Sequence, residues 1–377
     1  MAQPEGRATL ELVRDPQPGA PLVSVIIVNY NYGALIGAAI DSVLRQSYRR
    51  FELVICDDGS RDDSRDVIRS YAEQHPEVIR PLFKENGGVA SALNAAFASS
   101  SGDIISFLDA DDLFAPDKLE RVVRAFEAGV NVGLVVNRMA KLTSDGQMTG
   151  LIPQFGRLDR GWLREKVLAG GGHWSFAPTS GLSLSRGCAD RLFPIPEDEF
   201  RTEADSYIYT QATLFWPVAA IDEPVSTLRL HSSNITSSER MTAAYARRVT
   251  ASIERMCRAL ERTTSSHGLP RPRIERNPVY AEMTFVGDLL EGRGRLTVLN
   301  DLKRVWTAAL SCRTNDRVKV MSKPLVLSVA AVLPRRASEP LLQAVYAPTG
   351  LRTKIARFLT RRGSPPAVPQ SNKEEMQ

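Results

Sequence analysis

The 377-residue sequence is poor in cysteine, and its few cysteines are scattered. They are Cys56, Cys188, Cys257 and Cys312, and no two of them form a CxxC pair. This spacing argues against a disulfide framework and against a zinc site built on paired cysteines. We therefore expect a reduced, cytoplasmic protein.

Long apolar segments are also missing. The longest apolar run after the N-terminal region, "PLVLSVAAVLP" at residues 324–334, is about half of the ~20 residues that a membrane-spanning helix needs. Residues 1–20 lack the apolar segment of a secretory signal, so we expect a flexible leader there.

The net charge of +5 is divided unevenly along the chain. Residues 241–377 contain 24 Lys or Arg and 11 Asp or Glu, a net charge of +13, which leaves −8 for residues 1–240. An acidic first part and a basic second part suggest separate roles, and the basic part has the greater need of an acidic partner.

The first 130 residues alternate short apolar runs with helical patterns. Apolar, β-branched runs predict strands at 23–28, 51–56, 77–83 and 103–108. Apolar residues spaced three and four apart predict helices at 34–46, 61–74 and 87–100. Strands that are apolar throughout are typical of a parallel sheet covered by helices. This order predicts a doubly wound α/β domain.

The remaining residues give a mixed pattern and then a helical one. We expect a strand at 131–142, a glycine-rich loop at 170–186, a helix at 203–215, and a strand with its exit at 216–236. Residues 241–362 read as mainly helical, with an interruption rich in proline and glycine near 265–278. The last segment, 363–377, is predicted to be disordered.

Polar, turn-forming segments follow all four of the first predicted strands. They read "NYNYG", "CDDGSRDDS", "KENGG" and "DADD". In open parallel sheets, ligands bind beyond the carboxyl ends of the strands. The four segments therefore predict a single binding site.

The most acidic of these segments holds Asp109, Asp111 and Asp112 within four residues. Carboxylates this close raise one another's pKa unless a cation lies between them. Mg²⁺ prefers oxygen ligands and commonly joins one or two carboxylates to substrate phosphates. The alternative is an acidic turn that caps the next helix, and we expect Asp112 to cap or brace this turn rather than to bind metal.

The segment after the second strand contains Asp57 and Asp58. A carboxylate fixed at a strand end can accept an N–H from a pyrimidine ring and so give base specificity. The alternative is capping of the next helix, which is expected to account for Asp58 but not for Asp57 as well.

The blocks "VSVIIVNYNYGALIGAAIDSVLRQSYRRFELVICDDGSRDDS" and "ENGGVASALNAAFASSSGDIISFLDADD" resemble the nucleotide-sugar-binding half of a family 2 glycosyltransferase with the GT-A fold. The resemblance is specific over residues 21–128 and continues more weakly to about 236. It implies a Rossmann-like, mostly parallel sheet flanked by helices, followed here by a mainly helical C-terminal extension. The implied catalytic domain spans 21–240, with donor binding in 21–128 and acceptor binding in 129–240.

The resemblance also implies roles in donor binding. Asp57 would contact the base of the donor nucleotide, and the segment from Val28 to Tyr30 would pack near that base. Asp109 and Asp111 would form the DxD pair, Asp109 toward the ribose and the metal and Asp111 on the metal. One departure is that Leu93 precedes Asn94 where many relatives carry a basic residue, so Lys84 or a later residue would have to steady the donor phosphates.

In the acceptor half, "RTEADSYIY" and "STLRLHSSN" correspond to the family's ED-like and YRxH-like elements. Asp205 would be the general base, with Glu203 as the second choice. Arg229 would lie near the diphosphate, and His231 would be a further metal ligand. The alternatives are a helix-capping acid for Asp205 and a strand-end histidine for His231.

Two further features have both a functional and a structural interpretation. Trp174 could stack on the face of an acceptor sugar or lie in the core. Residues 351–362 form a basic amphipathic pattern that could lie on an anionic lipid surface at the cytoplasmic face of the membrane, or pack onto the protein itself.

These patterns and the resemblance together predict a metal-dependent, inverting glycosyltransferase. Its donor would be a nucleoside diphosphate sugar, first of all a UDP-sugar, bound with Mg²⁺ or Mn²⁺. Its acceptor would be a hydroxyl of a glycan or lipid-linked molecule, as in cell-surface polysaccharide synthesis, and no nucleic acid is expected to bind. One alternative is a nucleotidyltransferase, which would need a basic glycine-rich loop where the chain has "NYNYGALIG". The other is a non-catalytic nucleotide-sugar-binding scaffold, which would not need all four carboxylates.

Overall fold

The computed structural model describes residues 19–153, 156–175, 177–231, 241–311 and 317–346. Nearly all of the predicted leader, the basic helix predicted at 351–362, the predicted tail at 363–377 and Cys312 lie outside the described residues. The other three cysteines are buried free thiols.

The predicted alternation of strands and helices in the first 130 residues is confirmed. The strands are β1 (Val23–Asn29), β2 (Phe51–Asp57), β3 (Ile79–Phe83) and β4 (Ile104–Asp109), and the helices are α1 (Gly33–Leu44), α2 (Ser64–Gln74) and α3 (Val89–Ala98). β1, β2 and β4 are buried along almost their whole length, as expected for strands covered on both faces.

The second part of the sheet is made of shorter and more irregular strands. They are β5 (Leu113–Phe114), β6 (Leu134–Thr143), β7 (Met148–Ile152), β8 (Leu182–Ser185) and β9 (Val218–Leu230). The helices around them are α4 (Lys118–Glu127), α5 (Arg164–Ala169), α6 (Arg186–Leu192) and α7 (Ala204–Phe215), with a 3₁₀ turn η1 at Thr179–Gly181. The prediction of a loop throughout 170–186 is wrong in part, because β8 begins directly after η1 and joins the sheet.

All these strands belong to one 9-stranded sheet in the order β3-β2-β1-β4-β8-β6-β9-β5, with β7 paired to β6. β3, β2, β1 and β4 are parallel neighbours, and β6 is parallel to β9. β8 is antiparallel to both of its neighbours, so β6 and β9 run in the same direction as β4. The carboxyl ends of β1, β2, β3, β4 and β9 therefore lie at the same edge of the sheet.

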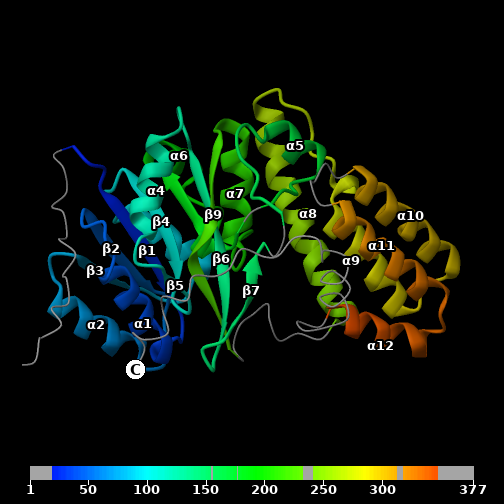
Figure 1. Ribbon diagram of the computed structural model, residues 1–377, viewed down its shortest axis with the longest axis horizontal. Helices are drawn as coiled ribbons and strands as arrows, with labels where there is room; N and C mark the ends of the chain where they lie inside the picture. The colour runs from blue at the N-terminus through cyan, green and yellow to red at the C-terminus, as the bar shows by residue number, and fades with distance from the viewer. Residues whose placement is uncertain (1–18, 154–155, 176, 232–240, 312–316, 347–377) are drawn as a thin grey trace, which may run out of the picture. The chain divides into compact units, whose positions relative to one another are not determined.

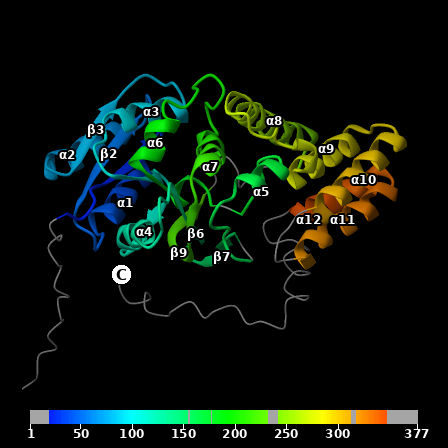
Figure 2. The same ribbon diagram turned by 90° about the horizontal axis from the view of Figure 1, so that it is seen from above.

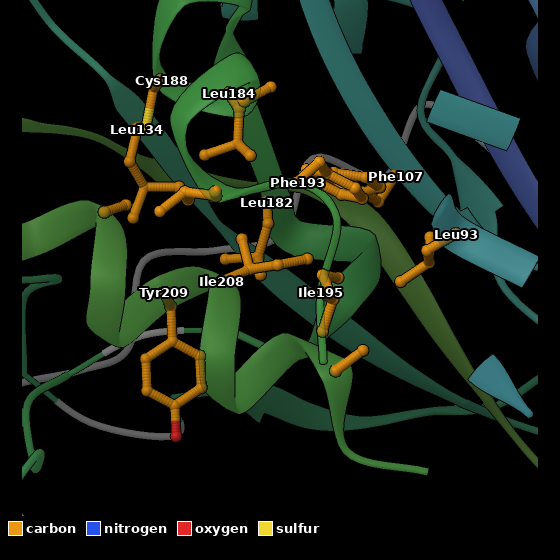
Figure 3. Close-up of a cluster of buried hydrophobic side chains, with 14 of the residues drawn as sticks. Leu93, Phe107, Leu134, Leu182, Leu184, Cys188, Phe193, Ile195, Ile208 and Tyr209 are labelled. Carbon is orange, nitrogen blue, oxygen red and sulfur yellow. The ribbon is translucent and has the colours of Figure 1, made fainter. Parts of the chain in front are cut away.

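Helices cover both faces of this sheet (Figures 1 and 2). On one face, α1, α2 and α4 pack on β1, β2 and β4 through aliphatic side chains such as Ile36, Ile40 and Val122. On the other face, α3, α6 and α7 pack on the same sheet, and Figure 3 shows part of that core, including Leu93, Phe107 and Ile208. The two cores fix the strand ends and so the loops that follow them.

The chain divides into two compact units. The first contains the sheet domain and Ala251–Asn277, which includes the end of α8 (Ala243–Ser266) and the 3₁₀ turn η2 (Ile274–Arg276). The second contains the start of α8 with α9 (Pro278–Glu291), α10 (Arg295–Ser311), α11 (Arg317–Val332) and α12 (Arg335–Tyr346). Its own apolar core is formed by residues such as Phe285, Ala308 and Leu327. Among the described helices, none has both the length and the apolar content needed to cross a bilayer.

Candidate active site

The loops after β1, β2, β3 and β4 and the end of β9 meet at the carboxyl edge of the sheet. The strand register places Asn29 beside Asp57 and Val28 beside Asp109. Side-chain contacts then join the loops, since the Asn29 amide donates to Asp57 Oδ1 over 2.8 Å. The sequence segments predicted to form one site therefore lie together.

Asp57, at the end of β2, is completely buried and has cationic and polar partners. Its Oδ2 accepts hydrogen bonds from Arg65 Nε at 2.8 Å and from the Ser60 N–H at 3.1 Å. Burial alone would raise the pKa of Asp57, but the hydrogen bonds from Ser60, Arg65 and Asn29 outweigh it and hold the pKa below its usual range. Asp57 is therefore a fully compensated carboxylate.

Asp58 does not cap α2, so that prediction is wrong. Its carboxylate binds the loop after β3, accepting from Lys84 Nζ at 2.8 Å and from the backbone N–H groups of Gly87 and Gly88 at 2.9 and 2.7 Å. Gly88 has φ of +92°, a left-handed conformation that favours glycine. Lys84, the suggested substitute for a phosphate-binding residue, is thus paired with Asp58.

The acidic loop after β4 differs from the β2 loop because it groups three carboxylates together. One carboxylate oxygen from each of Asp109, Asp111 and Asp112 lies within 4.8 Å of the others. Burial, followed by the charges of Asp112 and Asp111, raises the pKa of Asp109 well above its usual range. Burial and Asp111 likewise raise the pKa of Asp112 to about 7. A divalent cation with oxygen preference fits this donor set, because it would relieve the repulsion among the carboxylates.

Within this acidic loop, Asp112 is the most enclosed carboxylate. It accepts a hydrogen bond from Ser180 Oγ at 2.6 Å and one from the Arg229 backbone N–H at 3.3 Å, and it has no exposed surface. These contacts favour the predicted role of Asp112 as a brace for the turn, although its oxygen belongs to the acidic cluster.

His231 and Arg229 bring the end of β9 to the acidic loop. His231 Nε2 lies 3.0 Å from Asp111 Oδ2, so two of the residues predicted to bind the metal lie beside each other. The Arg229 guanidinium donates to backbone carbonyls, including those of Asp111 and, at 2.9 Å, Leu35. Arg229 therefore holds the backbone of the loop that was predicted to bind metal.

Asp205 lies in the first turn of α7. Burial raises its pKa to about 6, while a hydrogen bond from the Ser206 N–H at 2.8 Å acts in the opposite direction. The negative charge of Asp205 contributes to the raised pKa of Asp109, so the two carboxylates are close enough to interact. Glu203, the second choice for the base, is bound by Ser252 and by Arg255 at 3.3 Å.

The loop after β1 adds a residue that the sequence did not single out. Tyr32 meets the His231 ring edge to face, with 5.6 Å between ring centroids, and burial and then Asp111 and Asp109 raise its pKa to about 12. The predicted donor segment lies just before it: Val28 packs against the core, and Tyr30 is 44% exposed at the edge of the sheet. The only signal for Tyr32 was its place in "NYNYG".

Trp174 is a core residue rather than a sugar-stacking platform. Only 2% of it is exposed, and it packs edge to face on Tyr209 with ring centroids 5.9 Å apart. The structural interpretation of this tryptophan is therefore the correct one.

The chain is similar to known glycosyltransferases. Residues 24–191 match the family model described as Glycosyl transferase family 2. The chain is 38% identical over 212 residues to an uncharacterised glycosyltransferase of Nostoc sp., covering 56% of this chain and 66% of the relative. It is 37% identical over 117 residues to an uncharacterised glycosyltransferase of Rickettsia prowazekii, covering 31% of this chain and 36% of the relative. The chain thus spans just under two thirds of the first relative's length and about a third of the second's.

Among solved structures, the fold is similar to that of Staphylococcus aureus TarS 1–349, with a TM-score of 0.50 and 14% identity. This likeness covers 92% of this chain and 93% of the other. Together with the family match, it confirms the predicted GT-A fold.

Proposed function

We propose that this chain, a member of glycosyl transferase family 2 through residues 24–191, transfers a sugar from a nucleoside diphosphate sugar to a hydroxyl of a glycan or lipid-linked acceptor. The observation that carries the proposal is the meeting of two features at one sheet edge. One is the acidic cluster of Asp109, Asp111 and Asp112, and the other is the half-buried carboxylate of Asp205, whose charge acts on Asp109.

The acidic cluster would hold Mg²⁺ or Mn²⁺ through Asp109 and Asp111, with His231 beside them. When bound, the cation would neutralise the charge that develops on the departing diphosphate. Arg229 keeps the backbone of this loop in place through its bonds to the carbonyls of Asp111 and Leu35. Asp109 would face the ribose as well as the cation.

Donor recognition would use the β1 and β2 ends. Val28 and Tyr30 would pack near the base, and Tyr30 has the exposed ring that such a contact needs. Asp57 keeps its proposed place beside the base, but its buried carboxylate contacts Arg65 at 2.8 Å. We therefore expect Arg65 to share that role.

Asp205 would act as the general base of an inverting, single-displacement transfer. A sugar hydroxyl is a weak nucleophile and gains from a carboxylate that removes its proton as the new bond forms. The pKa of about 6 leaves Asp205 ionised near neutral pH while keeping it more basic than an ordinary aspartate. Glu203 is engaged by α8, which favours Asp205 over it.

The test is hydrolysis and transfer with a panel of UDP-, GDP- and dTDP-sugars, each with Mn²⁺, with Mg²⁺ and with a chelator. We expect metal-dependent release of a nucleoside diphosphate from at least one donor, first of all a UDP-sugar. Pyrophosphate release from a nucleoside triphosphate would instead indicate a nucleotidyltransferase. Donor binding by calorimetry without turnover on any acceptor would indicate a non-catalytic scaffold.

Contact with a membrane is a separate proposal, because the helix predicted at 351–362 lies outside the described residues. It is supported by exposed apolar side chains on two helices of the second unit: Leu296, Leu299 and Leu310 on α10, and Leu325, Val329 and Val332 on α11. Spacings of 3 and 11 residues on α10 and of 4 and 3 residues on α11 place each set on one helix face. The exposed cations Arg295 and Lys303 lie on α10 with them, which favours an anionic lipid surface as the partner.

Vesicle co-sedimentation tests this contact. The chain should sediment with phosphatidylglycerol vesicles and not with phosphatidylcholine vesicles. The double substitution Leu325→Ser and Val329→Ser should abolish sedimentation with the phosphatidylglycerol vesicles. Equal sedimentation of wild type and variant would argue against this face. Concentration-dependent dimerisation that the same substitutions abolish would indicate that a second copy covers it.

A further inference from the structure

Ser180, in the turn η1 before β8, is one of the residues that attach the acidic loop to the rest of the sheet. Its hydroxyl donates to Asp112 Oδ2 at 2.6 Å and accepts from the Asp109 backbone N–H at 3.0 Å. Ser180 has no exposed surface. A single buried hydroxyl therefore sets both the Asp112 carboxylate and the backbone that carries Asp109.

The carbonyl of Ser180 is held in turn by Lys118, the first residue of α4. Lys118 has no exposed surface, and its Nζ donates to Ser180 O at 2.8 Å, Asn137 Oδ1 at 2.8 Å and Ser226 Oγ at 3.0 Å. The same Nζ lies 4.0 Å from the centroid of the Phe114 ring. Burial lowers the pKa of Lys118 well below its usual range. The geometry nevertheless favours the ammonium, because the three acceptors match the three N–H bonds of the protonated amine and the ring face suits a cation.

We infer that Ser180 and Lys118 are positioning residues for the metal-binding loop. The Ser180 hydroxyl fixes the Asp112 carboxylate and the backbone of Asp109. Lys118 holds Ser180 in place by donating to the Ser180 carbonyl. Asp109 and Asp111 are thereby left to face a cation, while the ammonium of Lys118 is the buried positive charge behind the loop. This inference rests on the proposed binding of a divalent metal at Asp109 and Asp111.

The experiment compares Ser180→Ala with Ser183→Ala. Ser183 is an equally buried serine three residues away, and its hydroxyl pairs with Ser106 Oγ at 3.0 Å rather than with the acidic loop. Mn²⁺ affinity is measured directly by electron paramagnetic resonance on the full chain, and Tm by calorimetry. Outer-shell partners of a metal site typically change metal affinity by about 10–100-fold, and we expect a weakening of that size for Ser180→Ala. Ser183→Ala should keep the wild-type Kd even if its Tm falls by a similar amount.

The kinetic readout separates positioning from simple destabilisation. For Ser180→Ala, the Mn²⁺ concentration needed for half-maximal transfer should rise, whereas kcat at saturating Mn²⁺ should change little. Lys118→Met should weaken Mn²⁺ binding in the same way. If Lys118→Met does not fold, Ser226→Ala replaces it, because that change removes one acceptor of Lys118 and a 2.7 Å hydrogen bond to Ser180 O.

The outcomes distinguish a failure of this inference from a failure of the proposed metal dependence. Ser180→Ala with the wild-type Mn²⁺ affinity would overturn the role of Ser180. Unchanged affinity in Lys118→Met, or in Ser226→Ala where that variant replaces it, would overturn the role of Lys118. If the wild-type chain itself binds no Mn²⁺ or Mg²⁺, the proposed metal dependence fails, and the inference fails with it.

Discussion

The loops after β2 and β4 are both acidic, and both lie beside β1 at the same edge of the sheet. In the β2 loop two carboxylates pair with cations: Asp57 with Arg65, and Asp58 with Lys84, both at 2.8 Å. In the β4 loop the Arg229 guanidinium donates to the backbone carbonyls of Asp111 and Leu35. The first loop thus pairs two carboxylates with cations, whereas the second brings three carboxylates within 4.8 Å of one another.

The pKa values express the same difference. Hydrogen bonds hold the pKa of Asp57 below its usual range in spite of burial, whereas burial and neighbouring carboxylates raise the pKa of Asp109 and Asp112. An acidic segment at a strand end is therefore not by itself a metal site. What distinguishes the candidate cation site is the close grouping of three carboxylates at one strand end.

The largest effect that this comparison predicts is for Asp111→Ala. Removing this carboxylate takes away one of the two proposed metal ligands and the partner of His231 at 3.0 Å. Loss of metal assistance is worth several kcal/mol, so transfer should fall about a thousandfold or more, together with Mn²⁺ affinity. Steady-state transfer assays and Mn²⁺ titration measure the two losses. Wild-type transfer rates in this variant would refute the metal assignment.

The next effect concerns Asp205→Asn, which keeps the shape of the side chain and removes its basicity. A positioned base typically contributes about 10²–10⁴-fold, so turnover should fall by at least about a hundredfold. Donor and Mn²⁺ affinity should stay close to wild type, because Asp205 is not among the proposed ligands. Calorimetry with the donor provides that control, and a loss of turnover below about tenfold would remove Asp205 as the base.

A smaller effect, on stability, should separate the two acidic loops. Asp58→Asn weakens the contacts with Lys84 and with the N–H groups of Gly87 and Gly88. Hydrogen bonds to charged groups contribute about 1.5–3 kcal/mol, and we expect the free energy of unfolding to fall by about that amount. Urea denaturation measures the change. Mn²⁺ affinity should be unchanged, and a large loss of affinity would mean that the loops are not independent.

The sequence predicted most of this architecture because the parallel strands are apolar along their whole length and the loops after them are polar. It did not predict β8, a four-residue strand next to a glycine-rich segment. It placed Asp58 at a helix cap because capping is a local pattern, whereas the actual partners of Asp58 lie 26 to 30 residues away. Ser180 and Lys118 gave no signal at all, since the contact between them spans 62 positions and that between Ser180 and Asp112 spans 68.

The smallest predicted effect is the pH dependence of transfer. Burial raises the pKa of Asp205 to about 6, so this base is ionised at pH 7 and becomes protonated as the pH falls through 6. At saturating donor and Mn²⁺, kcat should then fall about tenfold per pH unit below 6. A bound cation lowers the pKa of the carboxylates that hold it, so Asp109 should not contribute to this limb once Mn²⁺ saturates the site. If the limb moved with Mn²⁺ concentration, the titrating group would belong to the β4 loop instead of Asp205.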